Sequence, residues 1–112
     1  MTHNHRHAPL GADLAPEMGA AVAAFNSAVF TGPGDIPRKY RELIAIAVAL
    51  TTQCESCIRF HTEDALALGA TEEELAEVTY IAAAMRSGGA LVHGMKALSV
   101  AARSNMQATR VS

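Results

Sequence analysis

The chain is poor in aromatic residues and has no long apolar stretch. It contains no tryptophan, two tyrosines and three phenylalanines among 112 residues, which argues against a β-sandwich because aromatic residues are enriched in strands. The longest uninterrupted apolar run, Leu43 to Leu50, has eight residues, whereas a membrane-spanning helix needs about 20. No period of 20–50 residues is visible, which argues against a repeat architecture.

The chain also lacks a strong charge of either sign. Nine Lys and Arg residues stand against eleven Asp and Glu residues, a net charge of -2. We therefore expect no nucleic-acid partner, which would require a basic patch or stripe, and no membrane partner, since no basic amphipathic helix is present. No apolar signal core follows the polar N-terminus, so the cytoplasm is the expected location. Two cysteines in that compartment are typical of a catalytic or metal-binding site.

Alanine and other apolar residues are abundant. Half of the chain is hydrophobic, and adding the eight glycines gives 64 of 112 residues, or 57%, against about 45–50% in an ordinary soluble domain. Small domains bury a smaller share of their surface than large ones, so this excess predicts a homo-oligomer. Alanine accounts for 23 residues and is the best helix former, which predicts an all-α fold.

The apolar periodicity and the capping residues predict five helices. Gly69 is suited to a helix C-terminus, and Thr71 with Glu74 fits a capping box, while Gly88-Gly89 is read as a break or a kink. We expect a single helical domain at residues 12–105, a flexible His-rich tail at 1–11 and a flexible tail at 106–112. The histidines of the N-terminal tail could capture metal. The expected helices are Asp13 to Phe30, Arg38 to Thr52, Cys54 to Leu68, Thr71 to about Ser87, and Ala90 to Arg103.

A cluster of Cys54, Cys57 and His61 carries the clearest chemical signal. On a helix the three side chains fall within a sector of about 60°. The helix N-terminus favours a thiolate, which is the reactive form of cysteine. Glu42 is a second candidate, because its neighbours at helical spacing are apolar and a partly buried carboxylate can accept or relay a proton. Alternatively, Glu42 simply ends the polar first turn of its helix.

Three interpretations of the cysteine cluster remain open from the residues alone. The thiols could pack as small hydrophobes. They could bind zinc together with His61, which leaves a fourth ligand to Glu42, His93, water or another subunit. A thiol–disulfide or peroxide-reducing site needs only the cysteine pair, an acid–base partner and access, and therefore no cofactor. His93 is expected to be a packed or capping residue, and the methionines are expected to fill the core or an interface.

The four residues Glu42, Cys54, Cys57 and His61 read E-x11-C-x-x-C-x-x-x-H. This signature resembles that of the alkylhydroperoxidase D-like members of the carboxymuconolactone decarboxylase family. The segment Gly69 to Leu75 is similar to that family as well, and the resemblance covers roughly residues 36–94.

The resemblance implies a small orthogonal helical bundle that assembles into trimers or hexamers. It also implies peroxide reduction with electrons from a dithiol, of the thioredoxin-like or lipoyl type. Cys57 would be the peroxidatic cysteine, Cys54 the resolving cysteine, and His61 with Glu42 the proton relay. Some members have histidine where this chain has Ser56, which implies a shorter relay. The decarboxylase branch generally lacks the cysteine pair, although decarboxylation or hydrolysis of a lactone-like substrate is a further alternative.

Overall fold

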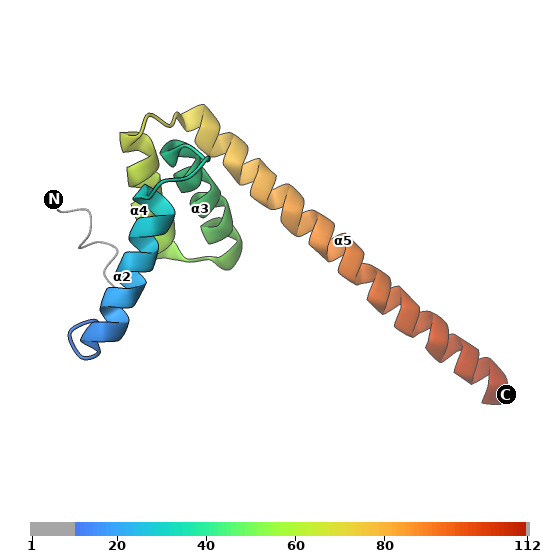
Figure 1. Ribbon diagram of the computed structural model, residues 1–112. Coiled ribbons are helices and arrows are strands. Elements are labelled where there is room, and N and C mark those ends of the chain that lie inside the picture. The colour runs from blue at the N-terminus through green and yellow to red at the C-terminus, as the bar shows by residue number, and fades with distance from the viewer. Residues whose placement is uncertain (1–10, 112) are drawn as a thin grey trace.

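The fold is entirely helical over the part of the chain that the structure describes. The structure is a computed structural model and describes residues 11–111. This range contains no strand, which confirms the all-α prediction. Residues 1–10 of the predicted His-rich tail lie outside the described range. Figure 1 shows its four helices, α2 (Pro16–Thr31), α3 (Arg38–Thr52), α4 (Glu55–Ala67) and α5 (Glu72–Val111).

The hydrophobic core forms where α3 packs against α4 and against the beginning of α5. Ala65 on α4 is completely buried, and its small side chain allows α3 and α4 to approach each other closely. On α3, Leu43 follows Glu42 directly and Ile46 lies one turn beyond it, while Ala65 lies one turn beyond His61 on α4. The same contact that forms the core therefore brings two of the predicted site residues together. The core cluster consists of Leu43, Ile46, Ala65, Ala70 and Val78.

The first three helices agree closely with the sequence predictions. Proline occupies the first turn of α2, and α3 has the predicted bounds. Gly69 follows α4 with a φ of 95°, and the Ala70 N–H donates to the Ala65 carbonyl at 2.9 Å, which is a Schellman C-terminus. The Thr71–Glu74 capping box at the start of α5 is confirmed, with two reciprocal hydrogen bonds of 3.0 Å each.

The predicted break at Gly88-Gly89 is wrong, because α5 runs through both glycines as a single helix of 40 residues. A glycine in a helix interior costs only about 1 kcal/mol relative to alanine and keeps its backbone hydrogen bonds. The two glycines therefore weaken the helix without ending it. Helix also continues through residues 106–111, which belong to the predicted flexible tail. The division into a domain at 12–105 and two flexible tails stays a prediction.

The C-terminal part of α5, residues 87–111, projects away from the other helices (Figure 1); we call it the α5 arm. Every residue from 83 to 110 is exposed, and the longest dimension of the molecule is 72 Å. Before the arm begins, Arg86 donates a hydrogen bond to the Thr51 carbonyl at the end of α3. None of the helices within residues 11–111 is both long and apolar enough to cross a membrane.

Candidate active site

The two cysteines lie at the junction between α3 and α4. Gln53 ends α3 in the left-handed conformation, with a φ of 58°, and turns the chain so that the Cys54 N–H donates to the Ala49 carbonyl. Cys54 is then the N-cap residue of α4, with extended backbone, and Cys57 occupies the first turn of that helix. The junction therefore places both sulfurs at a helix N-terminus, as predicted.

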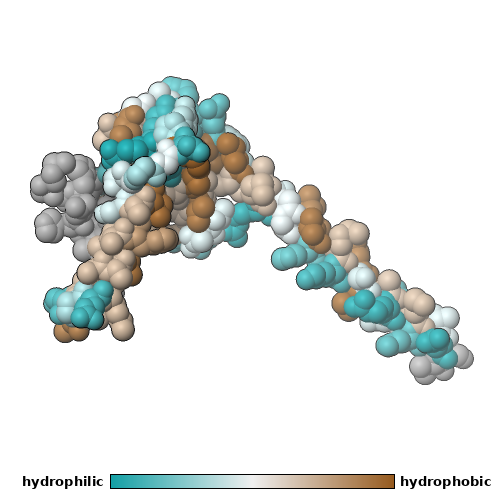
Figure 2. All heavy atoms as spheres, viewed as in Figure 1, coloured by the Kyte–Doolittle hydropathy of each residue, from teal (hydrophilic) through white to brown (hydrophobic). Residues whose placement is uncertain are grey.

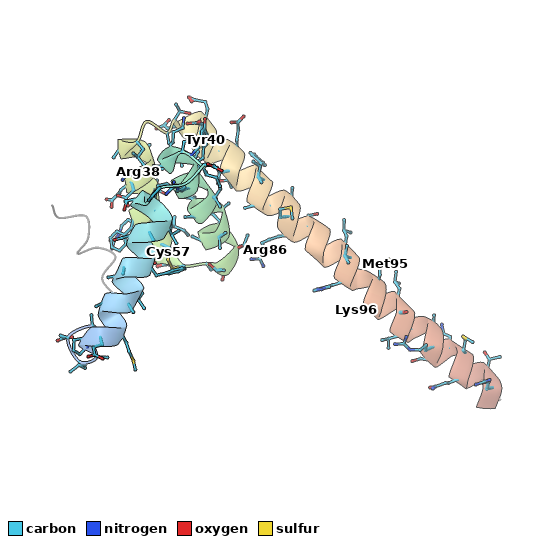
Figure 3. The ribbon with its side chains drawn as sticks, in the orientation of Figure 1. Arg38, Tyr40, Cys57, Arg86, Met95 and Lys96 are labelled. Carbon is cyan, nitrogen blue, oxygen red and sulfur yellow. A yellow bond between two sulfur atoms is a disulfide. The ribbon has the colours of Figure 1, made fainter. Side chains whose placement is uncertain are left out.

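Cys54 and Cys57 form a disulfide, with Cα atoms 5.3 Å apart. This Cα separation falls within the usual range for disulfides. Both residues are half-buried, and the adjacent Ser56 is exposed, with its hydroxyl oxygen 3.8 Å from the Cys54 sulfur. Cys57 is labelled in Figure 3 and lies in the first turn of α4. In this oxidised state the sulfurs are bonded to each other and do not offer the thiolates that zinc would require.

Glu42 on α3 and His61 on α4 form a direct hydrogen bond. His61 Nδ1 lies 2.9 Å from Glu42 Oε2, and the two side chains are 12% and 5% exposed. Glu42 is the one charged or polar residue among the described residues that is classed as buried, which confirms the expected position of its carboxylate on an apolar stripe. His61 is one helical turn beyond Cys57, so the pair links a buried carboxylate to the redox helix.

Phe30 is a site residue that the sequence did not predict. Its ring lies 4.7 Å from the His61 ring, centroid to centroid, at an interplanar angle of 36°. This contact fixes one face of the imidazole from α2, while Glu42 holds its edge from α3. No spacing in the sequence connects Phe30 with His61, because 31 positions separate them and only packing brings them together.

A pocket of about 430 Å³ opens beside Phe30 at the end of α2. Its charged lining residues are Asp35 and Arg41, and the others are apolar or glycine. The Arg41 guanidinium donates hydrogen bonds to the carbonyls of Val29, Gly32 and Ile36, so its donors hold the α2–α3 turn in place. The pocket is therefore suited to an apolar group. It is lined by Ala28, Val29, Phe30, Pro33, Gly34, Asp35, Ile36, Arg41, Ile44 and Ala45.

His93 does not occupy the position that the sequence predicted, and several methionines lie outside the core of this chain. His93 is exposed in the interior of the α5 arm and is neither packed nor a cap within the chain. Met85, Met95 and Met106 on α5 are 65% to 71% exposed and Met18 is 75% exposed. They are therefore not core residues of this chain, and the interface alternative remains for them. Figure 3 shows Met95 on the arm, far from Cys57.

A group of three side chains could hold a metal ion. Donor atoms of Glu42, His61 and Asp64 lie within 4.8 Å of one another. Asp64 was not predicted as a site residue, although its spacing of three residues from His61 places both on one helix face and could have indicated it.

Comparison with known proteins agrees with this architecture. A protein of Paracoccus denitrificans described as "Uncharacterized protein 4 in cox locus" is 42% identical over 80 residues, which cover 71% of each chain. An uncharacterised protein of Cupriavidus necator is 41% identical over 81 residues, or 70% of this chain and 72% of the relative.

Among solved structures, apo-lpg0406, a carboxymuconolactone decarboxylase family protein from Legionella pneumophila, is similar with a TM-score of 0.63 and 34% identity. The similarity covers 80% of this chain and 79% of that one. The profile of the carboxymuconolactone decarboxylase family matches residues 16–99. The chain therefore belongs to the carboxymuconolactone decarboxylase family.

Proposed function

We propose that this protein reduces peroxides at the Cys54–Cys57 pair, using a dithiol as electron donor. The observation that carries the proposal is the disulfide in the first turn of α4, one turn before a histidine that a buried carboxylate holds. The arrangement combines a reversible two-electron centre with a proton donor and acceptor. It requires no metal or organic cofactor.

In the reduced state, Cys57 would be the attacking thiolate. Its position in the first turn of α4 gives it the unpaired N–H groups of the helix N-terminus, which stabilise negative charge. His61 follows one turn later and is oriented by Glu42 and Phe30. His61 can accept the thiol proton and later donate a proton to the departing oxygen, and Glu42 stabilises the protonated imidazole between these steps.

The chemical steps balance as a two-electron reduction. The Cys57 thiolate attacks the nearer peroxide oxygen, the O–O bond breaks, and water or an alcohol leaves after it takes the proton from His61, while Cys57 becomes a sulfenic acid. The Cys54 thiol then displaces water and forms the disulfide seen here. Two thiolates of an external dithiol reopen the disulfide through a mixed disulfide and are themselves oxidised. The donor is of the thioredoxin-like or lipoyl type.

The pocket beside Phe30 favours an organic peroxide with an apolar substituent as the substrate. Phe30 lines the pocket and also contacts His61, so a substituent seated there would lie next to the proton relay. A volume of about 430 Å³ lies within the range of small-molecule sites. We expect a lower KM for a bulky apolar hydroperoxide than for hydrogen peroxide.

The functional form that we propose is a homo-oligomer, a trimer or a hexamer, located in the cytoplasm. Figure 2 shows apolar side chains along both α2 and α5, and α2 and the arm diverge within one chain (Figure 1), so neither can cover the other. Most of the stability of a helix in a protein comes from tertiary packing of its apolar face. A second copy supplies matching apolar faces. The exposed side chains include Val22, Phe25, Leu91, Met95 and Leu98.

The oligomer is tested by Leu91→Glu with Leu98→Glu, measured by light scattering after size exclusion. The wild type should elute as a trimer or hexamer and the double variant as smaller species. Lys96→Glu, on the arm but outside the apolar set, is the matched control. A monomeric wild type would contradict this part of the proposal.

The peroxidase activity is tested by peroxide consumption with several dithiol donors. Cys57→Ser should abolish turnover, whereas Cys54→Ser should let the enzyme react once and accumulate a sulfenic acid on Cys57, detected by mass spectrometry. Wild-type turnover in Cys57→Ser would overturn the assignment. Ser56→Ala, which keeps both thiols and the relay, controls for local disturbance. Stoichiometric zinc with no reactive thiols in reduced protein purified without a tag would favour the metal-binding alternative.

A further inference from the structure

Asp64 adds a third donor to the Glu42–His61 pair, and this set goes beyond what peroxide reduction requires. One donor atom from each of the three side chains lies within 4.8 Å of the others. We propose that Glu42, His61 and Asp64 form a binding site for a first-row divalent cation such as Zn²⁺. The bound ion would occupy the proton relay and inhibit the enzyme reversibly.

The donors have the chemistry and nearly the spacing that zinc requires. Zinc binds imidazole nitrogen and carboxylate oxygen at about 2.0–2.2 Å with tetrahedral geometry, which places neighbouring donors about 3.3 Å apart. His61 Nδ1 and Glu42 Oε2 are 2.9 Å apart, so a small separation of these two side chains admits the ion between them. Asp64 is half-buried, and one of its carboxylate oxygens lies within 4.8 Å of the other two donor atoms. Three protein ligands leave one position for water.

The backbone arrangement also matches metal sites in helical proteins. His61 and Asp64 are three residues apart on α4, and Glu42 faces them from α3. In helix bundles, carboxylate metal sites are likewise built from a carboxylate–histidine pair at this spacing on one helix and a carboxylate from a facing helix. Glu42 is 4% exposed, and a bound cation would neutralise its charge in this dry environment.

This site differs from zinc binding by the cysteine pair. The two sulfurs are joined in a disulfide, and none of the three proposed donors is a thiolate. Binding should therefore persist in oxidised protein. Inhibition would follow because the ion uses the same Nδ1 and carboxylate oxygen that hold His61 for proton transfer.

The test is a titration of Zn²⁺ into oxidised, full-length protein, in which binding is measured by isothermal titration calorimetry. His3, His5 and His7 are replaced by alanine in every sample, because histidine-rich tracts bind metals themselves. Asp64→Asn removes the negative charge of one ligand, which weakens it as a zinc donor, and preserves the size of the side chain. Glu63→Gln removes the same charge at the neighbouring, exposed position and is the matched control.

We expect one Zn²⁺ per chain, at least tenfold weaker binding in Asp64→Asn, and binding within about twofold of the parent in Glu63→Gln. Co²⁺ should give a visible spectrum without a sulfur charge-transfer band. Absence of saturable binding in the parent protein, equal affinity in Asp64→Asn, or equal weakening in both variants overturns the proposal. Circular dichroism confirms that each variant is folded, and Asp64→Ala repeats the test with a different side chain. Because binding is measured in oxidised protein, the result is independent of peroxidase activity.

Discussion

Replacement of Glu42 by glutamine should reduce peroxide turnover far more than it reduces stability. The carboxamide has the shape of the carboxylate and can still accept a hydrogen bond from His61, but it carries no negative charge to stabilise a protonated imidazole. General acid–base groups contribute about 10²–10⁴-fold to rates, so we expect kcat/KM to fall about 100-fold. This factor corresponds to about 2.7 kcal/mol in the activation barrier.

The expected loss of stability is smaller. A hydrogen bond to a charged group contributes about 1.5–3 kcal/mol and a neutral one about 0.5–1.5 kcal/mol, so Glu42→Gln should cost about 1 kcal/mol. In a domain of this size that lowers the melting temperature by about 4–8 °C. With a total stability of about 5–15 kcal/mol, more than 99% of the variant remains folded at 25 °C. Unfolding therefore cannot account for a 100-fold loss of rate.

The assay compares steady-state peroxide consumption with thermal unfolding for Glu42→Gln and a matched control, Glu74→Gln. The control also replaces one glutamate by glutamine. Glu74 lies in the capping box of α5 and forms an ion pair with Lys39. Its replacement should therefore lower the melting temperature without lowering the rate of peroxide consumption. The double variant Glu42→Gln with His61→Gln should lose little more activity than the more damaging single variant, because the two residues act as a unit. A Glu42→Gln enzyme with more than about one-third of wild-type activity would refute the relay.

Three further predictions concern the scaffold. Arg41→Ala should lower the free energy of unfolding, measured in urea, by about 2 kcal/mol, because three carbonyls at the α2–α3 turn lose their donor. Arg38→Ala is the control. An unchanged midpoint of the urea transition in Arg41→Ala would contradict the role of Arg41. Gly69→Ala should cost about 1 kcal/mol, since its φ is 95° although no atom lies within 4 Å of an added Cβ; equal melting temperatures would contradict this reasoning. The Thr71 N–H and the Lys39 ammonium hold the pKa of Glu74 below its usual 4.5, so its stabilising effect is present above pH 4.5 and lost as the pH falls through the lowered pKa. Wild type and Glu74→Gln should therefore differ in melting temperature at pH 6 and converge at the most acidic pH at which both fold, and a constant difference would contradict the assignment.

The local signals of the sequence were sufficient for most helix boundaries. Proline in the first turn of α2, Gly69 after α4 and the Thr71–Glu74 box act through neighbouring backbone atoms, so their effect can be read from adjacent residues. Gly88-Gly89 was misread because glycine only weakens a helix, whereas proline both removes a donor and clashes.

The sequence by itself determined the all-α class, the placement of the cysteine pair at a helix N-terminus, and the identity of Glu42 and His61 as candidates, because these depend on spacing along one chain. Only the tertiary structure decided that Glu42 bonds directly to His61, that Phe30 covers the imidazole, and that Asp64 completes a set of three metal donors. These contacts join α2, α3 and α4 across 19 to 31 positions of sequence, or depend on where a helix face points. They arise from the close packing of α3 against α4 around Ala65, which no local pattern of residues encodes.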